Sequence, residues 1–306
     1  MKKLEIKNLE ASVKGRLQNR AKATNRSFSE VLQYYGMERF LYRFSQSEYS
    51  GIFVLKGALM FTVWDVKERR TTVDIDFLAN YDNKVNEIEQ VVKEVCKVNV
   101  APDGLIFDSV SVKGKKIKED ADYEGVRVKF TGYLERSKIP MQIDFGFGDL
   151  IHPSAKKIKF PVILNFPEPE LYGYTVESVI AEKFEAMVKL GVANSRMKDF
   201  YDVWLMARQF DFEGKVLVQA VQKTFKKRKT VLPVSAPFFP PEIYDKDSKK
   251  NLMWEAFLKV ERITNAPSKL NDVVKAIEAF LIKPVEAIHE GKDFNPEWKA
   301  PGPWKI

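Results

Sequence analysis

The stretch RRTTVDIDFLAN, from Arg69 to Asn80, decides the fold. Asp74 and Asp76 alternate in it with the apolar residues Val73, Ile75 and Phe77. Successive side chains of a strand point to opposite faces, so the pattern predicts a buried strand that carries both carboxylates on one face. Two like charges on one face repel each other and are costly to desolvate. Such a strand therefore needs a cation or water on its acidic face.

A metal ion is one way to offset this charge. Asp74 and Asp76 are two residues apart, which places their Cα atoms roughly 7 Å from each other on one strand. A hard divalent cation such as Mg2+ prefers carboxylate oxygens and usually takes only one or two of them from the protein, together with substrate phosphates. The alternative interpretation is an edge strand whose outer face is wet.

A third acid strengthens the metal interpretation. In PMQIDFGFGD, residues 140–149, Gln142 and Asp144 alternate with apolar residues, so Asp144 lies on the polar face of a second strand. Another strand is predicted before it at residues 123–134, with a turn at residues 135–138. Three acids from two strands can define a two-cation site for phosphoryl transfer.

Composition and charge narrow the class of protein. The chain has 306 residues, enough for about two domains. Its 50 Lys and Arg residues against 42 Asp and Glu leave a net charge of +8. That balance suits a polyanionic partner such as nucleic acid or a nucleotide, although many basic proteins bind neither. With Cys96 as the only cysteine and two histidines, neither a disulfide nor a structural zinc site is expected.

Targeting signals are not expected either. No apolar run approaches the ~20 residues of a membrane span, and the N-terminus MKKLEIKNLEAS lacks the apolar core of a signal peptide. We therefore expect a cytoplasmic protein with no membrane partner.

The pattern of predicted elements changes near residue 165. Before it, strands alternate with helices at residues 9–21, 27–35, 58–64 and 85–95, and further strands are predicted at 52–55 and 104–118. The proline-rich residues 153–169 are interpreted as a linker. After it only helices are predicted, followed by an irregular tail; the helices span residues 175–190, 196–210, 214–227, 251–263 and 268–282. This pattern favours an α+β domain at residues 1–165 and an α-helical domain at residues 166–306.

A glycine turn is the first candidate for phosphate binding. Gly57 follows a buried strand that ends at Lys56, and it precedes a short helix. Such a turn exposes backbone N–H groups at a helix N-terminus, where a phosphate can bind. A plain turn explains one glycine equally well.

An inward-facing lysine is the second candidate. On the helix predicted at residues 175–190, Lys183 falls near the middle of the apolar arc. A lysine there requires an anionic partner or a route to water for its ammonium group. It is either a phosphate ligand in a cleft or half of a buried ion pair with a carboxylate, and the sequence leaves both open.

Two further charged segments are candidates. In SRMKDFYDVW, Asp199 and Asp202 lie three residues apart on one helix face, where Arg196 and Lys198 could instead pair with them in a solvated patch. The basic run KTFKKRK, residues 223–229, could contact a nucleic-acid backbone, or it could simply end a helix in water.

Taken in order, these segments resemble the AbiEii/AbiGii toxin family of nucleotidyltransferases. The resemblance covers residues from about 50 to 230, in the segments FVLKGALMFTVW, RRTTVDIDFL, GVRVKFTGYL, MQIDFGFGD and ESVIAEKFEAMVKLGVANSRMKDFYDVW. It implies a nucleotidyltransferase core of the DNA-polymerase-β type, with a mixed sheet flanked by helices, and a helical C-terminal domain.

The resemblance also implies roles for single residues. The metal-binding acids of the family fall on Asp74 and Asp76, and the third strand acid of the wider superfamily falls on Asp144. The glycine turn, a triphosphate contact, falls on Lys56-Gly57.

The remaining family positions lie in the C-terminal half. The lysine of the AEK helix falls on Lys183, and the acid of the R-x-K-D-x-x-D segment falls on Asp199, followed by Asp202. We expect Lys183 and Asp199 to take part in catalysis, and Lys183 and Asp202 to take part in nucleotide binding.

One departure concerns the glycine turn. The superfamily often has Gly-Ser or Gly-Gly-Thr there, but this chain has Gly57-Ala58 and lacks the hydroxyl group. Backbone N–H groups, or the nearby Thr71 and Thr72, would have to contact the triphosphate instead.

These observations predict a nucleotidyltransferase that uses Mg2+ or Mn2+ and transfers NMP from an NTP to an acceptor. The resemblance implies that the acceptor is RNA such as tRNA, that the protein is the toxin of a toxin–antitoxin system, and that its cognate antitoxin is encoded separately. The alternatives are a nucleotide-binding protein without catalysis and a plain RNA-binding module.

Overall fold

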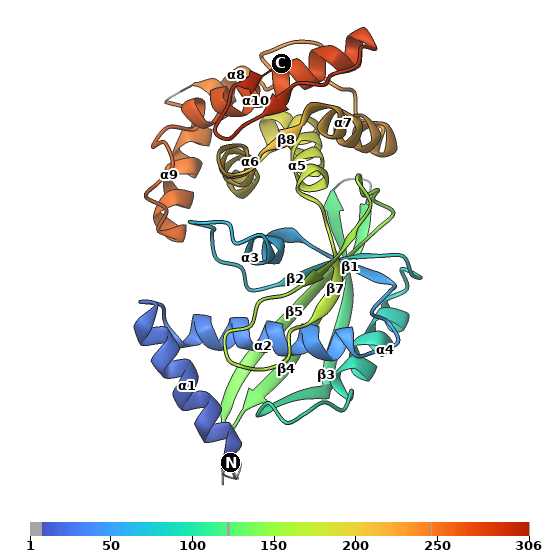
Figure 1. The fold of residues 1–306 in the computed structure, drawn as a ribbon, viewed down its shortest axis with the longest axis vertical. Helices are drawn as coiled ribbons and strands as arrows, with labels where there is room; N and C mark the ends of the chain where they lie inside the picture. The colour runs from blue at the N-terminus through green and yellow to red at the C-terminus, as the bar shows by residue number, and fades with distance from the viewer. Residues whose placement is uncertain (1–7, 121–122, 246, 306) are drawn as a thin grey trace. The chain divides into compact units, whose positions relative to one another are not determined.

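The computed structural model describes residues 8–120, 123–245 and 247–305 (Figure 1). The chain forms two compact units. The first consists of Met1–Trp64, Thr72–Gly148 and Lys156–Gly173, and the second of Asp65–Thr71, Asp149–Ala155 and Tyr174–Ile306. Among the described helices, none is long and apolar enough to span a bilayer.

The first unit is built on a seven-stranded mixed sheet in the order β3-β4-β5-β2-β1-β7-β6. In chain order the strands are β1 (Phe53–Lys56), β2 (Ile75–Ala79), β3 (Leu105–Asp120), β4 (Tyr123–Leu134), β5 (Ser137–Phe147), β6 (Lys156–Lys159) and β7 (Glu170–Gly173). β2 runs parallel to β5 and antiparallel to β1, while β4 and β5 form an antiparallel hairpin. The mixed sheet predicted from the sequence is confirmed.

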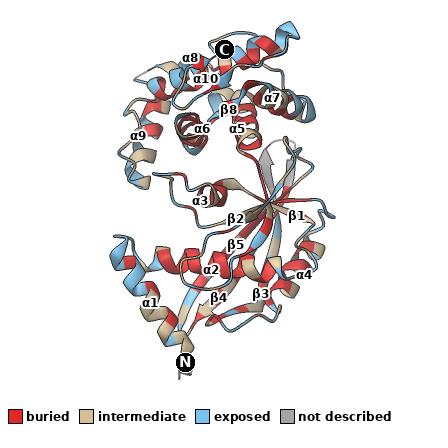
Figure 2. Cartoon of the chain, viewed as in Figure 1, coloured by how far each residue is buried: buried red, intermediate tan, exposed pale blue. Residues whose placement is uncertain are grey.

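The first unit also contains helices. They are α1 (Leu9–Ala23), α2 (Phe28–Ser45), α3 (Met60–Val63, directly after the single turn η1, Gly57–Leu59) and α4 (Val85–Cys96). α2 contacts β5 and β7, and α4 contacts β3 and β4. The rings of Phe40 and Phe44 on α2 meet Phe77 and Phe130 of the strands, and all four residues are buried. Much of α2 is coloured as buried in Figure 2. The apolar positions of the alternating strands therefore face α2, which leaves the polar positions on the other side.

Two predictions about the first unit are wrong. β2 begins at Ile75, so Asp74 precedes the strand, and Val73 has 64% of its surface exposed instead of lying in the core. The proline-rich linker predicted at residues 153–169 contains β6 and leads into β7, which pair with each other. Pro161, Pro167 and Pro169 fall in the loop between them, which the hydrogen bond from the N–H of Phe160 to the carbonyl of Pro169 closes.

The second unit is mainly helical, as predicted. Its helices are α5 (Val176–Leu190, followed by the turn η2, Gly191–Ala193), α6 (Met197–Gln209), α7 (Gly214–Arg228), α8 (Pro241–Tyr244), α9 (Lys249–Glu261) and α10 (Leu270–Glu290).

The C-terminal segment is ordered, which contradicts the irregular tail predicted there. β9 (Glu297–Trp298) pairs with β8 (Phe212–Glu213) and with β10 (Trp304–Lys305). Trp298 and Trp304 are buried, and their indole N–H groups donate to the carbonyls of Ala207 and Phe280. Indole rings need both apolar cover and a hydrogen-bond partner, and the helices supply both.

Candidate functional site

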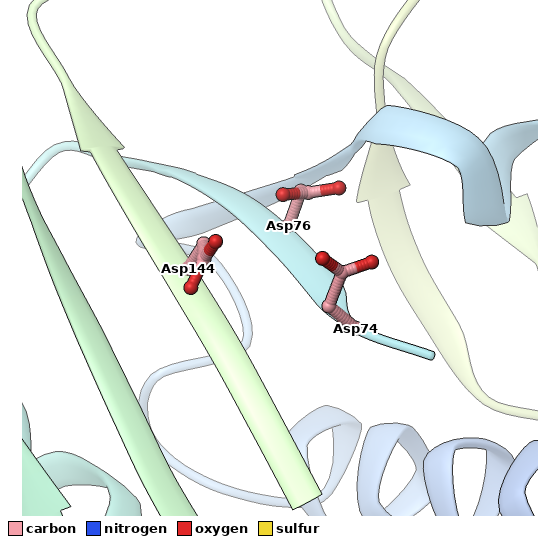
Figure 3. A group of neighbouring side chains, drawn as sticks. All are labelled: Asp74, Asp76 and Asp144. Carbon is pink, nitrogen blue, oxygen red and sulfur yellow. The ribbon is translucent and has the colours of Figure 1, made fainter. Parts of the chain in front are cut away.

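The structure brings the three predicted acids of the first unit together. Asp76 on β2 and Asp144 on β5 are direct cross-strand partners in the parallel ladder, and Asp74 comes one residue before β2. One carboxylate oxygen from each lies within 4.8 Å of the others, and the side chains converge in Figure 3. This arrangement fits a hard divalent cation, because such an ion prefers several carboxylate oxygens around one point.

An arginine that sequence reasoning missed lies beside these acids. Arg127 on β4 is the cross-strand partner of Asp144. Its Nε donates to Oδ1 of Asp144 at 2.8 Å, and its Nη2 donates to Oδ2 at 2.6 Å. These hydrogen bonds raise the pKa of Arg127, and the charges of Asp74 and Asp76 act in the same direction. Arg127 therefore keeps its positive charge beside the acid cluster.

The glycine turn lies against one of the acids. Lys56 is the cross-strand partner of Asp76, and Gly57 follows it with a φ of +70°. A Cβ atom at position 57 would overlap the carboxylate of Asp76. The turn is thus a support of the acid cluster, in addition to its predicted contact with a triphosphate.

Thr72 also supports an acid. Its hydroxyl donates to Oδ1 of Asp74 at 2.6 Å, and its backbone N–H donates to the hydroxyl of Tyr34. A hydroxyl has one proton to donate. In this conformation Thr72 therefore orients Asp74 and has no proton left for a phosphate.

The predicted residues of the C-terminal half gather in the second unit. Nζ of Lys183 on α5 lies 2.5 Å from Oδ1 of Asp199 and 2.9 Å from Oδ2 of Asp202, both on α6. Arg70, a second residue that sequence reasoning missed, binds both oxygens of Asp202 at 3.1 Å. Lys183 thus has the anionic partner that its inward position required.

The charges in this cluster stabilise one another. Burial lowers the pKa of Lys183, but the carboxylates of Asp199 and Asp202 outweigh burial and hold the pKa above its usual value. Burial likewise raises the pKa of Asp202, but Arg70 and Lys183 reverse the shift, so the pKa is below its usual value. The cluster thus pairs two basic side chains, Arg70 and Lys183, with two acidic ones, Asp199 and Asp202. Of the two interpretations of Lys183, the buried ion pair is present, while its role as a phosphate ligand stays a prediction.

The basic run at residues 223–229 is only partly available to a nucleic acid. Arg228 is bound to Glu185 at 2.7 Å and to Asp149 at 3.0 Å, and its side chain is buried. The neighbouring Lys226 and Lys227 at the end of α7 are exposed.

A comparison with protein families finds a match over most of the chain. A model of the family described as nucleotidyl transferase AbiEii toxin, type IV toxin–antitoxin system, matches residues 39–280. This range contains all of the site residues described above. Among curated proteins, none matches the chain.

Two solved structures are similar to this chain. The crystal structure of JHP933 from Helicobacter pylori has a TM-score of 0.50 and 14% sequence identity, and the alignment covers 87% of this chain and 95% of that one. A second H. pylori structure, of a proposed nucleotidyltransferase, has a TM-score of 0.49 and 14% identity over 88% of this chain and 100% of that one. The likeness to JHP933 concerns the fold.

Proposed function

The chain belongs to the AbiEii family of nucleotidyl transferase toxins of type IV toxin–antitoxin systems, and from this we propose that it transfers NMP from an NTP to a hydroxyl group of RNA, tRNA among the candidates, with Mg2+ or Mn2+ as cofactor. The observation that carries the proposal is the convergence of Asp74, Asp76 and Asp144 within 4.8 Å. A cognate antitoxin, encoded separately, is the expected protein partner.

Asp74, Asp76 and Asp144 would hold the metal. When bound, a divalent cation neutralises negative charge on the triphosphate and on the α-phosphate that is transferred. Thr72 and the Gly57 turn keep two of these carboxylates in place. Because Asp76 and Asp144 are paired in the sheet and Asp74 comes one residue before β2, their spacing is set before any ligand arrives.

In the transfer itself, the acceptor oxygen forms a bond to the α-phosphorus. The bond from that phosphorus to the bridging oxygen breaks, and pyrophosphate leaves with the electron pair. We assign Asp144 to orient the acceptor hydroxyl and to help remove its proton, because this acid lies on β5, whereas Asp76 lies on β2 and Asp74 directly before it.

We assign the remaining predicted residues to the nucleotide. Lys56 and the N–H groups of the Gly57 turn would bind the triphosphate, and Lys183 would supply a positive charge for it. Asp199 and Asp202 hold the ammonium group of Lys183, so they would act on the nucleotide through that lysine.

The charge of the sheet supports a polyanionic acceptor. Lys113 on β3 pairs across the ladder with Lys129 on β4, and Lys115 pairs with Arg127. Cross-strand partners share a face of the sheet, so these lysines lie on the face that carries Asp144. All three lysines are exposed. A row of cations beside the acids suits a phosphate backbone that must reach the site.

Label transfer from each of the four NTPs to total RNA tests the reaction. We expect incorporation by the wild type, and a loss of at least about 100-fold in Asp76→Asn, because that acid lies at the centre of the cluster. Asp82→Asn, which removes an exposed acid just beyond β2, should keep wild-type incorporation. Equal incorporation by the wild type and Asp76→Asn would refute the assigned site.

The acceptor surface has its own test. The triple variant Lys113→Gln, Lys115→Gln, Lys129→Gln should bind RNA more weakly. The slope of log K against log salt concentration should be shallower than that of the wild type by about 2, since each of the three lost phosphate contacts with a single strand contributes ~0.7. The matched control changes three exposed lysines of β6 in the same way: Lys156, Lys157 and Lys159. An unchanged salt slope would remove this surface from the acceptor path.

Nucleotide binding without catalysis is the second candidate. It is favoured by two observations: Ala58 has no hydroxyl group, and the hydroxyl of Thr72 is bound to Asp74. Calorimetric titration with NTP separates the two functions. Tight, Mg2+-dependent binding together with no label transfer under any condition would support the second.

A further inference from the structure

Arg127 binds both carboxylate oxygens of Asp144, one of the three acids in the cluster. Its Nε and Nη2 donate to the two different oxygens of Asp144, in the parallel, bidentate geometry that makes arginine–carboxylate pairs strong. Asp144 is buried, whereas about a third of the Arg127 side chain, 32%, remains exposed. The guanidinium can therefore move toward solvent, while the carboxylate is fixed in β5.

The contact of Asp74 is of a different kind. Its Oδ1 accepts a hydrogen bond from the neutral hydroxyl of Thr72. A neutral donor orients a carboxylate without cancelling its charge, so Asp74 stays attractive to a cation. A guanidinium both cancels the charge of its carboxylate and repels a second cation. A metal ion and Arg127 therefore compete for the carboxylate of Asp144. The described hydrogen bond to Asp74 comes from a neutral group, so it brings no such competition.

We propose that Arg127 is a positioning residue, the internal counter-ion of Asp144, which withholds this acid from the cation in the nucleotide-free protein and leaves Asp74 as a first ligand. Asp144 then binds the cation only after the guanidinium of Arg127 has moved away from it. The inference rests on the proposed function solely for the presence of a metal site.

The Arg127–Asp144 pair makes a specific prediction about double substitutions. The pair has no net charge, so removing both partners should leave the electrostatic potential at the bound metal ion nearly unchanged. Removing only Arg127 should release Asp144 as an additional ligand. Removing only Asp144 should leave an unpaired positive charge beside the cation.

Binding of Mn2+ to the full-length, nucleotide-free protein, measured by electron paramagnetic resonance or calorimetry, tests these three cases. We expect Arg127→Met to bind Mn2+ about tenfold more tightly than the wild type, and Asp144→Asn to bind more weakly. The double variant Arg127→Met, Asp144→Asn should stay within about threefold of the wild type. Arg127→Lys, which keeps the charge but cannot bind both oxygens, should lie between the wild type and Arg127→Met.

The outcomes separate this inference from the proposed function. Weaker binding by Arg127→Met, in a variant that unfolds at the wild-type temperature, would overturn the inference while leaving the metal site in place. A loss of more than tenfold in the Mn2+ affinity of the double variant would also overturn the inference, because it would show that Asp144 already binds the cation in the nucleotide-free protein. If the wild type binds no Mn2+ and Asp76→Asn behaves identically, the inference and the proposed metal site both fail.

Discussion

Residue 57 must be glycine for two independent reasons. Its φ of +70° belongs to the left-handed region, which side chains with a Cβ rarely adopt. In addition, a Cβ there would collide with the carboxylate of Asp76. The close approach of the turn to Asp76 therefore depends on the missing side chain.

Gly57→Ala should lower label transfer by about 100-fold or more, because it must displace either the turn or Asp76, and small shifts at a reacting centre cost rates of that size. Gly51→Ala is the matched control, since a Cβ at residue 51 meets nothing within 4 Å. Activity close to the wild type in Gly57→Ala would show that the turn and Asp76 can separate without harm.

Thr72 should act on the metal through Asp74. Thr72→Val removes the hydrogen bond at nearly constant volume. We expect Mn2+ affinity to fall about tenfold, the usual effect of losing a group that orients a metal ligand. Thr71→Val, whose hydroxyl contacts Glu261 instead, should leave Mn2+ affinity unchanged. Equal affinity in both variants would mean that Asp74 needs no support.

The strand that carries Arg127 could be predicted from the sequence, but its register could not, because a turn closed by residues 135 and 138 would put Arg127 opposite Gly146. The turn was predicted at residues 135–138, whereas β4 and β5 pair with Leu134 opposite Ser137. Counting back along both strands from that pair places Arg127 opposite Asp144. Arg70 offers no such signal, because its partner Asp202 is 132 residues away and no local pattern connects them.

At the scale of elements, α2 carries a buried ion pair that holds the loop between β6 and β7. Glu38 accepts a hydrogen bond from the N–H of Ile163, and Arg39 donates to the carbonyl of Pro167. Nε of Arg39 lies 2.9 Å from Oε1 of Glu38. Burial raises the pKa of Glu38 to about 7, although Arg39 opposes the shift.

This pair predicts how stability depends on pH. A carboxyl group whose pKa is higher in the folded state binds more protons there, so the free energy of unfolding falls as pH rises from about 4.5 to 7. The contribution of Glu38 across this window is at most about 3 kcal/mol. Urea unfolding between pH 5 and 7 should show a shallower dependence on pH in Glu38→Gln than in the wild type.

Glu48→Gln, at an exposed position just after the same helix, should keep the wild-type slope. Parallel slopes for Glu38→Gln and the wild type would contradict a raised pKa at Glu38.

Elements with a clear period could be predicted from the sequence, and short ones without a period could not. α4 and α5 follow the apolar spacing of a helix, and β4 and β5 follow strict alternation. The strands β6 and β7 have four residues each, too few to show a pattern, and they exist because β1 offers an edge for pairing. The same holds for the two-residue strands of the C-terminal segment, which long-range contacts of two tryptophans hold in place.

At the scale of the whole molecule, the two units are interleaved along the chain. Residues 65–71 and 149–155 belong to the second unit, although both segments are flanked by parts of the first. Each segment is tied to the helices by charge: Arg70 binds Asp202, and Asp149 binds Arg228. Ion pairs between distant parts of the sequence thus complete the second unit.

Asp202→Asn should destabilise the protein by about 3–5 kcal/mol, because two buried cations, Arg70 and Lys183, lose a charged partner at once. The midpoint of urea unfolding measures this change. Asp293→Asn, at an exposed acid just beyond α10, should shift stability by less than about 0.5 kcal/mol. Equal stability of the two variants would show that the cluster contributes little to folding.

The interleaved path also affects how the protein is made. Arg70 leaves the ribosome 132 residues ahead of the aspartate that neutralises it, and Asp149 precedes its arginine by 79 residues. A nascent chain that stops before residue 202 therefore contains the acids of the sheet but not the counter-charge of Arg70. The ion pairs that complete the second unit can both form only after Arg228, of 306 residues, has been translated, so a chain terminated before that point should be degraded faster than the full-length chain.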